Sequence, residues 1–374
     1  MKSTPLLFGY VVVLVPPALL CISTNSGHPW LTCICFVLAS PVTRFLVGVY
    51  RPRPLVVSEM LASLLHKLPW LYVATLAICL PASAAALADI SADRPLDLLG
   101  FGVSLWTVLT FGTFPAHELL HRRNKSAAIA GSICAGACGY PILGLEHVAH
   151  HLNPGRTAVP EWAKVNESVW SFCFRRIQDA LRTAASSDSA MRRSQQWLPA
   201  LRPLTAGVAT WAATSLMFFS LAGVRGLWVY GAACVDVVLA IQIMTYVQHW
   251  GLGDDSFPDA HSRELAWEDD CLMQAWLTMN DSFHMAHHRE PETPYYFLQP
   301  APTAPRQPGC YVVMLHACLV PSIWRRLMRP VLEAFVSGSP LVCEPGRRAL
   351  CITPTRRLDT PSRESVDISG ENTS

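Results

Sequence analysis

Six apolar stretches of about 20 residues constrain the fold of this chain more than any other feature. They lie at residues 5–24, 29–50, 68–89, 97–116, 204–224 and 226–246. About 20 apolar residues are enough for a helix to cross the roughly 30 Å hydrocarbon core of a bilayer. The chain is also too apolar for an ordinary soluble domain, because 51% of its residues are hydrophobic and only 15% are charged. The sequence therefore predicts an all-α integral membrane protein with six transmembrane helices.

The charged residues between these stretches predict the orientation of the bundle. Two of the connecting segments are rich in arginine and lysine, namely Arg51, Arg53, Lys67, Arg122, Arg123 and Lys125. The connections at the opposite end carry only Arg94 and Arg225. Because positively charged loops stay in the cytoplasm, both termini are expected there. A removable signal peptide is the less favoured interpretation of the first stretch, since Pro16 and Pro17 interrupt it and no small-residue cleavage site follows.

The polar and histidine-rich segments divide the chain into five parts. In order these are four membrane helices, a histidine-rich segment, a two-helix hairpin, a second histidine-rich segment and a tail, at residues 1–116, 117–203, 204–246, 247–335 and 336–374. The two histidine-rich segments are expected to form a cytoplasmic helical cap. The Gly- and Ala-rich residues 126–145 predict a buried or re-entrant helix rather than a full crossing. The tail is polar and rich in Pro, Ser and Thr, which predicts disorder.

The thirteen cysteines do not indicate a disulfide framework. Most of them lie within apolar stretches, and the large polar segments are expected in the reducing cytoplasm. We therefore interpret them as small core residues. The chain contains no C-x-x-C pair, which argues against a fused rubredoxin or a four-cysteine zinc module.

Nine of the thirteen histidines fall in four short clusters, HELLH, EHVAHH, QHWGL and HMAHH. Positions i, i+3 and i+4 of a helix share one face, so a cluster with two or three histidines can direct its rings to one point. Neutral imidazole is a ligand for iron, zinc, copper and nickel. The predicted metal ligands are His117, His121, His147, His150, His151, His249, His284, His287 and His288. The isolated histidines, expected to be surface or packing residues, are His28, His66, His261 and His316.

Two other functions were weighed against a two-metal site. H-E-x-x-H alone is typical of zinc proteases, in which Glu118 would be the general base. A single zinc needs only three protein ligands and a water, however, and nine clustered histidines are enough for two metal ions. A metal transporter would place its ligands near the middle of the bilayer, whereas these clusters follow the ends of the apolar stretches.

The clusters and the segments around them resemble the alkane 1-monooxygenase and xylene monooxygenase family of membrane di-iron hydroxylases, which are relatives of the membrane fatty-acid desaturases. The resemblance covers about residues 97–335 and rests on FGTFPAHELLHRR, EHVAHH, VNESVWSF, TYVQHWGL, LAWEDDC, HMAHH and QPGCYVVMLHACLVPSIWRRLM. It implies that the nine histidines hold two iron ions and that O2 is a co-substrate. The implied substrate is an apolar alkyl or lipid-like molecule, and the implied location is the bacterial cytoplasmic membrane.

Several positions depart from the family pattern. The second cluster is one residue shorter than is usual in alkane hydroxylases and matches the desaturase spacing. Gln242 and Gln248 stand where the family usually has glutamates, and Met285 and Ala286 replace a stretch that usually contains an aspartate. These departures leave desaturation or oxidative decarboxylation of a fatty-acyl chain as alternatives to hydroxylation.

Residues near the clusters are candidates for orienting the imidazoles through their second ring nitrogen. We selected Glu118 and Glu146, which adjoin ligand histidines, and Gln242, which would share a helix face with His249. Asp236 lies on the opposite side of that helix. An acid inside a membrane span is a functional hypothesis, and the alternative is a structural pair with a hydroxyl group or Arg44.

One helix face suggests how a substrate reaches the metals. Trp106, Thr110 and Thr113 would share the face of His117 and form a stripe from the middle of the membrane to the site. A substrate could enter from the lipid along this stripe, and the alternative is ordinary helix packing.

Electrons for O2 must come from another protein, because the chain has no G-x-G-x-x-G motif after a strand and no group of four closely spaced cysteines. The resemblance suggests a separate rubredoxin or ferredoxin with its NAD(P)H-dependent reductase. Such carriers are usually acidic, so the basic residues beside the first and last clusters are candidate docking residues. They are Arg122, Arg123, Lys125, Arg325, Arg326 and Arg329, and their alternative role is to bind anionic lipid headgroups. No nucleic-acid partner is expected.

Overall fold

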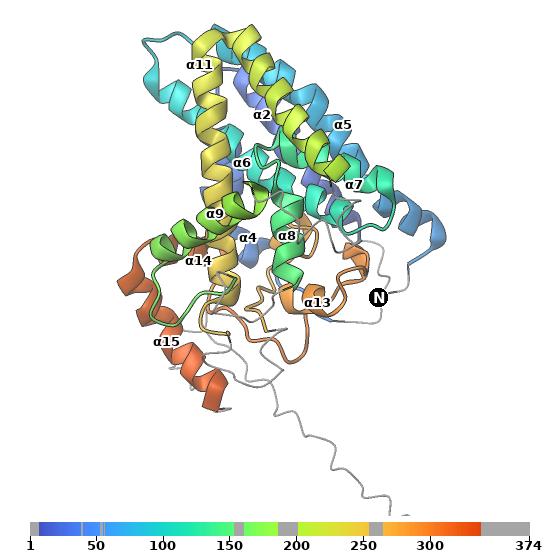
Figure 1. Cartoon of the computed structure of the whole chain (residues 1–374), viewed down its shortest axis with the longest axis vertical. Coiled ribbons are helices and arrows are strands. Elements are labelled where there is room, and N and C mark those ends of the chain that lie inside the picture. Colours follow the sequence, from blue (N-terminus) through green and yellow to red (C-terminus); the bar gives the residue numbers. More distant parts are fainter. Residues whose placement is uncertain are drawn as a thin grey trace, which may run out of the picture.

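Helices account for the regular structure of the described part of the chain (Figure 1). The computed structural model describes residues 7–337, apart from residues 39, 53–54, 56, 153–160, 186–200 and 254–264. Within these residues, β pairing is limited to two isolated bridges. The prediction of an all-α fold is therefore confirmed. The predicted tail lies outside the described residues, except for its first two.

Three helices are long and apolar enough to cross a membrane. They are α5 (Glu59–Asp89), α6 (Pro95–Leu120) and α11 (Leu201–His249). α11 is interrupted at Gly223, whose φ of 64° is a left-handed conformation that glycine adopts without steric cost. Its two halves therefore run side by side in opposite directions (Figure 1), at the positions of the predicted hairpin. The interruption at Gly223 lies close to the boundary between the apolar stretches 204–224 and 226–246.

The first two predicted spans are not confirmed as continuous helices. The first consists of a short 3₁₀ helix, η1 (Gly9–Leu14), followed by α2 (Val15–Asn25). Prolines occupy the first turn of α2, a position where the missing backbone N–H of proline costs no helical hydrogen bond. The second is divided into α3 (Leu31–Cys33), a π-helical turn η2 (Ile34–Leu38) and α4 (Ser40–Val47). The number of membrane crossings therefore stays a prediction.

A short buried helix, α7 (Lys125–Ala137), lies against α6 and α11. The Asn124 side chain caps it by accepting a hydrogen bond from the backbone of Ser126. α7 approaches the first half of α11 so closely that a Cβ on Gly136 would lie 2.1 Å from the backbone oxygen of Gly207. The contact therefore requires glycine.

The remaining helices form the end of the molecule that carries the histidine clusters (Figure 1). They are α8 (Leu143–Leu152), α9 (Val169–Ala185), α12 (Leu272–Leu277), α13 (His284–Arg289), η5 (Tyr295–Phe297), α14 (Tyr311–Cys318) and α15 (Pro321–Ser337). A tryptophan-rich apolar core supports this end, with Trp162, Trp250, Trp267 and Trp324 all fully buried. The histidine segments thus have a core of their own.

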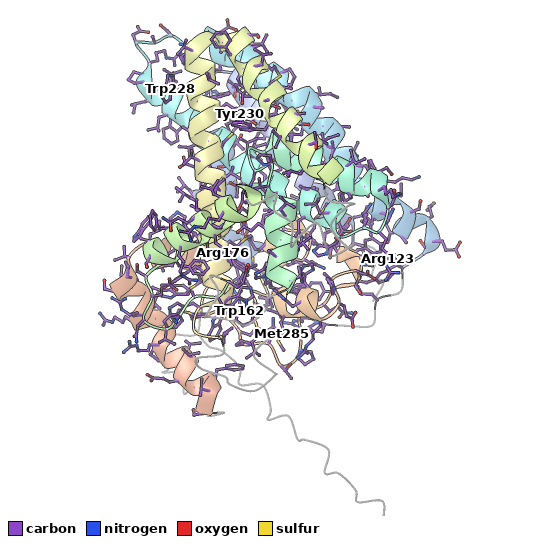
Figure 2. All side chains as sticks on the ribbon, viewed as in Figure 1. Arg123, Trp162, Arg176, Trp228, Tyr230 and Met285 are labelled. Atoms are coloured by element: carbon purple, nitrogen blue, oxygen red, sulfur yellow. The ribbon has the colours of Figure 1, made fainter. Side chains whose placement is uncertain are left out.

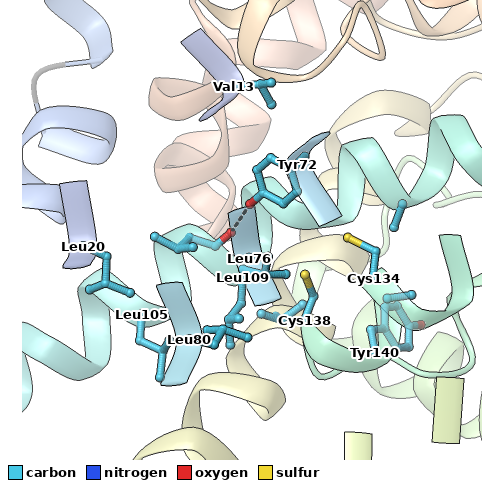
Figure 3. Close-up of a cluster of buried hydrophobic side chains, with 14 of the residues drawn as sticks. Val13, Leu20, Tyr72, Leu76, Leu80, Leu105, Leu109, Cys134, Cys138 and Tyr140 are labelled. Carbon is cyan, nitrogen blue, oxygen red and sulfur yellow. Dashed lines mark hydrogen bonds between the residues drawn. The ribbon is translucent and has the colours of Figure 1, made fainter. Parts of the chain in front are cut away.

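The core between the long helices is separate and contains several of the cysteines (Figure 3). Tyr72 of α5 donates a hydrogen bond to the backbone oxygen of Val108 in α6, at 3.2 Å. Cys134 and Cys138 pack beside this contact as free thiols. The described cysteines are all free, in agreement with their interpretation as small core residues.

The Gly136 contact gives a stability prediction. Gly136→Val should lower the free energy of unfolding by about 1–3 kcal/mol, because its side chain would push α7 and α11 apart. Gly231→Val is the matched control, since a Cβ at Gly231 meets no atom within 4 Å. Denaturation midpoints of the purified variants in one detergent measure the difference. Equal midpoints would contradict the close approach of the two helices.

Candidate metal centre

The nine clustered histidines converge at one place, beside the ends of α6 and α11. Their ring nitrogens form two groups of four, in each of which the nitrogens all lie within 4.8 Å of one another. The first group contains His117, His121, His147 and His287. The second contains His150, His249, His284 and His288. The ninth ring, His151, lies beside the first group, with its Nε2 atom 2.9 Å from that of His147 and 3.2 Å from that of His287.

Helical spacing divides single clusters between the two groups. On α8, His147 and His151 are one turn apart and face the first group, whereas His150 faces the second. On α13, His287 belongs to the first group and His284 to the second. Each of these short helices therefore holds the two groups at a fixed separation.

The arrangement of ring nitrogens fits metal ions. The Nε2 atom of His147 lies 2.9 Å from that of His117 and 2.5 Å from that of His121. A neutral imidazole has only one N–H, so such a set cannot be satisfied by hydrogen bonds among its own members. The buried Nε2 atom of His249 is also unsatisfied, because it has no hydrogen-bond partner in the described structure. Several lone pairs directed to one point form the donor set that a transition-metal ion accepts.

Burial keeps the imidazoles in the form that binds metals. Burial disfavours the charged ring and the neighbouring histidines oppose a second charge, so the pKa values of four of the histidines on α8 and α13 are lowered. His147, His150, His287 and His288 are shifted well below their usual value. These rings are therefore neutral at physiological pH, as metal ligation requires.

Three groups outside the histidines fix the orientation of the second set of rings. Glu161 Oε2 lies 3.1 Å from Nδ1 of His150, and Asp281 Oδ1 lies 3.3 Å from Nδ1 of His284. The backbone oxygen of Leu265 lies 3.2 Å from Nδ1 of His249. The hydrogen bonds to His150 and His249 hold a proton on Nδ1 and leave the Nε2 lone pair directed into the group, whereas Asp281 and His284 are in ion-pair contact without a hydrogen bond.

Sequence reasoning missed Glu161 and Asp281. Asp281 precedes His284 by three residues, and this spacing could have indicated it. Glu161 follows His150 by eleven residues and lies between helices, so no periodic pattern connects them. Trp162, whose ring stacks on His249 with centroids 4.3 Å apart, was missed for the same reason.

The three residues selected to orient the imidazoles have other partners in the described structure. Gln242 Nε2 donates to Glu146 Oε1 at 2.9 Å and to the hydroxyl of Tyr140 at 3.0 Å. Glu118 pairs instead with Arg122 at 3.2 Å. It follows His117 directly, and successive residues of a helix point about 100° apart, so the side chains of Glu118 and His117 diverge.

A buried arginine connects Glu146 to the histidines indirectly. Arg176 of α9 lies 2.6 Å from Glu146 Oε1 and 2.7 Å from Glu161 Oε2, and Glu161 in turn contacts His150. Figure 2 shows Arg176 at the level of the metal groups. Burial alone would lower the pKa of Arg176, but the two carboxylates outweigh it and raise this pKa. Burial also raises the pKa of Glu161, to about 7, despite the nearby guanidinium group. Arg176 therefore stays charged and balances the buried acids.

A second acidic segment, in LAWEDDC, holds α13 in place. The side chain of Glu268 is fully buried and accepts hydrogen bonds from Arg306 at 2.7 Å and from the backbone of Ala286 in α13. Asp269 pairs with Arg44 of α4 at 3.0 Å. Arg44 therefore forms an ion pair with Asp269 and not with Asp236, the acid in α11. The Asp236 side chain is exposed on the helix surface and has no hydrogen bond or ion pair to the residues that the structure describes.

The predicted stripe on α6 reaches the site only at its end. A cavity of about 60 Å³ adjoins both histidine groups, and Thr113 lines it together with Phe114, Ile241 and Met244. Trp106 and Thr110 do not line this cavity. Trp106 packs against the core between the long helices, which agrees with the alternative of ordinary helix packing.

The isolated histidines take no part in the two groups. His66 and His316 lie on the surface, where His66 is close to Arg122 and His316 bonds to its own helix. His28 belongs to neither group, and His261 lies outside the described residues.

Comparison with known proteins places the chain in a family. The family model for fatty acid desaturases matches residues 96–309, which is more than half of the chain. The chain belongs to the fatty acid desaturase family. This membership confirms the resemblance inferred from the sequence motifs.

Several proteins that are similar to this chain are named monooxygenases. Alkane 1-monooxygenase 1 of Pseudomonas aeruginosa is 27% identical over 261 residues, which cover 65% of this chain and 66% of the relative. Alkane 1-monooxygenase 2 of Alcanivorax borkumensis is 23% identical over 65% of this chain and 66% of its own. The xylene/toluene monooxygenase hydroxylase component of Pseudomonas putida is 26% identical over 73% of this chain and 74% of its own. The matches to the alkane monooxygenases thus span slightly less than two thirds of those proteins.

The contact between Glu161 and His150 gives a prediction about metal affinity. Glu161→Gln should weaken metal binding about 10–100-fold, because the acceptor that orients His150 loses its charge. Glu167→Gln is the matched control, since Glu167 pairs with Arg175 and bonds to no histidine. Metal content after dialysis against increasing chelator concentrations measures the affinity. Equal retention by the two variants would show that Glu161 does not support the site.

Proposed function

We propose that this protein is a membrane di-iron monooxygenase that hydroxylates an unactivated C–H bond of an apolar alkyl or lipid-like substrate with O2. The observation that carries the proposal is the pair of adjacent histidine groups, each able to hold one metal ion. The desaturase family and the names of the relatives support the choice of iron and of oxygen chemistry. An unactivated C–H bond offers no acidic or basic group, so general acid–base catalysis alone could not attack it.

The zinc protease is less well supported by this geometry. Its general base would have to face a water on the metal, but Glu118 is paired with Arg122. One zinc ion would also leave several of the nine converging histidines without a partner. A transporter is disfavoured because the histidines lie at helix ends, at one end of the molecule.

Iron bound by the two groups would supply O2 activation and hydrogen abstraction, and the protein would supply position and exclusion of water. Phe114, Ile241 and Met244 give the small cavity an apolar wall beside the ring nitrogens. The hydroxyl of Thr113 donates to the backbone oxygen of Thr110 at 2.6 Å, so its hydrogen is already engaged. An apolar carbon could lie against this wall, while the remaining lining of the cavity is polar and includes Glu146, Arg176 and Gln248.

The departures from the family pattern have a structural counterpart. Gln248, which stands where the family usually has glutamate, donates to Asp281 at 3.3 Å, and Asp281 faces His284. A glutamate here would place a second acid beside Asp281. The glutamine thus supports the orientation of a metal-binding ring, which is compatible with hydroxylation. Desaturation or decarboxylation of a fatty-acyl chain is the alternative outcome of the same hydrogen abstraction.

We further propose that electrons come from a separate rubredoxin or ferredoxin with an NAD(P)H-dependent reductase, at the cytoplasmic face of a bacterial inner membrane. The candidate basic residues lie on two sides of the molecule, since Arg123 (Figure 2) and α15 (Figure 1) are well separated. Arg123 is paired with Glu292. Arg325 and Arg326 on α15 have no ion-pair partner in the described part of the chain, so their charge favours α15 as the docking surface.

Aromatic rings connect α15 with the metal groups. Trp324 of α15 is fully buried, and its ring centroid lies 5.8 Å from that of Trp250. Trp250 directly follows His249, a member of the second histidine group. A donor on α15 would therefore have a short packed path to the metals.

Turnover in the presence of ¹⁸O2 tests the proposed activity. Purified protein supplied with iron, a reductant and a mixture of alkanes, alkylbenzenes and fatty acids should give an alcohol that carries the label. His147→Ala should abolish this product and lower the metal content, because His147 contacts three other ligand rings. His316→Ala is the matched control and should change neither. An alkene without label would instead establish desaturation or decarboxylation, and peptide cleavage without O2 uptake would establish the protease.

Charge reversal on α15 tests the proposed docking surface. Arg325→Glu with Arg326→Glu should lower the rate driven by the protein donor severalfold and flatten its dependence on salt, because opposite charges steer the encounter. Turnover driven by a chemical reductant should not change. Arg123→Glu serves as the control on the other side of the molecule. Equal losses with the protein donor and the chemical reductant would assign Arg325 and Arg326 to folding or to lipid headgroups.

A further inference from the structure

An apolar cavity of about 510 Å³ lies on the flank of the molecule, between α9 and the two halves of α11. Its lining includes Ile142, Ile177, Trp211, Leu227, Trp228 and Val238. Trp228 is 73% exposed and lies at the outer edge of the long helices (Figure 2). The mouth of the cavity therefore faces the region that the bilayer would occupy around the long helices.

The flank cavity and the metal cavity are lined by residues that are adjacent in sequence. Neighbouring residues line the two cavities on α9, where Ile177 faces the flank cavity and Arg176 the metal cavity. At the start of α8, Ile142 lines the flank cavity and Leu143 lines the metal cavity. Along the second half of α11, the flank-cavity lining ends at Val238 and the metal-cavity lining begins at Ile241, one turn later.

A hydrogen-bonded group connects the linings of the two cavities. Tyr140 lines the flank cavity and Glu146 lines the metal cavity. The Gln242 side chain, which is fully buried, donates to both of them, at 3.0 Å and 2.9 Å. Tyr140 and Gln242 therefore form part of the barrier between the two cavities.

The lining determines what the flank cavity can accept. Among the residues that the structure describes, no charged side chain lines it, and the hydroxyl of Ser215 already donates to the backbone oxygen of Trp211 at 2.9 Å. A free carboxylate would meet no cation among these residues, and the cost of burying its charge favours uncharged molecules. The volume is within the range of about 300–1,000 Å³ typical of small-molecule sites.

We propose that the flank cavity binds the uncharged alkyl chain of the substrate before it reaches the metals, and that the Tyr140–Gln242 contact is part of the gate between them. This inference rests on the proposed function. It assigns an uncharged alkane or alkylbenzene, rather than a free fatty acid, as the substrate class. It also assigns access to the site through the α9–α11 flank, in place of the α6 stripe predicted from the sequence.

Two glycines allow the flank and the stripe to be compared. Gly231 lines the flank cavity, and a Cβ there meets no atom within 4 Å, so Gly231→Leu would fill the cavity without a backbone clash. Gly102 precedes Trp106 by one helical turn and shares its face. A Cβ on Gly102 would lie at an ordinary contact distance, 3.8 Å, from Val229. Gly102→Leu is therefore the matched variant on the stripe.

The experiment uses a linear alkane that carries a photoreactive diazirine, with the full chain in phospholipid nanodiscs and without added iron. Mass spectrometry should find the label on α9 and α11 residues that line the flank cavity, and excess unlabelled alkane should displace it. Gly231→Leu should abolish this labelling and, with iron restored, raise KM for long alkanes at unchanged kcat. Gly102→Leu should alter neither. Denaturation midpoints equal to that of the parent establish that both variants are folded.

Two results would overturn the inference. Labelling that phospholipid displaces but alkane does not would mean that a bilayer lipid occupies the cavity. Loss of labelling and a raised KM in Gly102→Leu alone would assign the substrate to the α6 stripe. The experiment distinguishes a failure of this inference from a failure of the proposed function. Labelled alcohol without flank labelling removes the inference alone, whereas alkane-displaced flank labelling without any oxygenated product supports the binding site and removes the proposed function.

Discussion

The convergence of nine buried or half-buried imidazoles is the constraint on which the rest of this structure depends. Their lone pairs face one another, so each ring must be held neutral and in one orientation before any metal binds. Glu161 and the Leu265 carbonyl do this for the second group by hydrogen bonds, and Asp281 lies 3.3 Å from Nδ1 of His284. Acceptors of this kind bring negative charge into the core, and Arg176 balances two of the buried carboxylates. The helices around the site thus serve an electrostatic requirement as well as a packing one.

The site also determines how distant parts of the chain must meet. α8 and α13 each contribute to both histidine groups, although the whole of α11 separates them in the sequence. Glu268 fixes α13 through backbone and arginine contacts, and the Gly136–Gly207 approach brings α7, just before α8, against α11. The membrane helices therefore act as the frame against which the two short helices are aligned.

Sequence reasoning predicted the parts of this arrangement that repeat with the period of a helix. The histidine clusters followed from i, i+3 and i+4 spacing, and the hairpin from its apolar pattern around Gly223. Glu161 and Leu265 could not be found in this way, because their contacts to His150 and His249 join irregular segments. The first two spans were predicted as continuous because hydropathy detects neither the prolines at the start of α2 nor the π-helical turn at Ile34–Leu38. Glu146 and Gln242 were predicted to orient imidazoles, but they bond to each other and to Arg176, which lies on a different helix.

The central claim is that one chain binds two iron ions through these histidines. Elemental analysis of the purified protein, combined with its molar concentration from amino-acid analysis, tests it most directly. Two histidine groups with converging Nε2 atoms predict two iron ions per chain, with X-ray absorption dominated by imidazole nitrogen. One tightly bound zinc ion per chain, with no iron retained after reconstitution, would contradict the account.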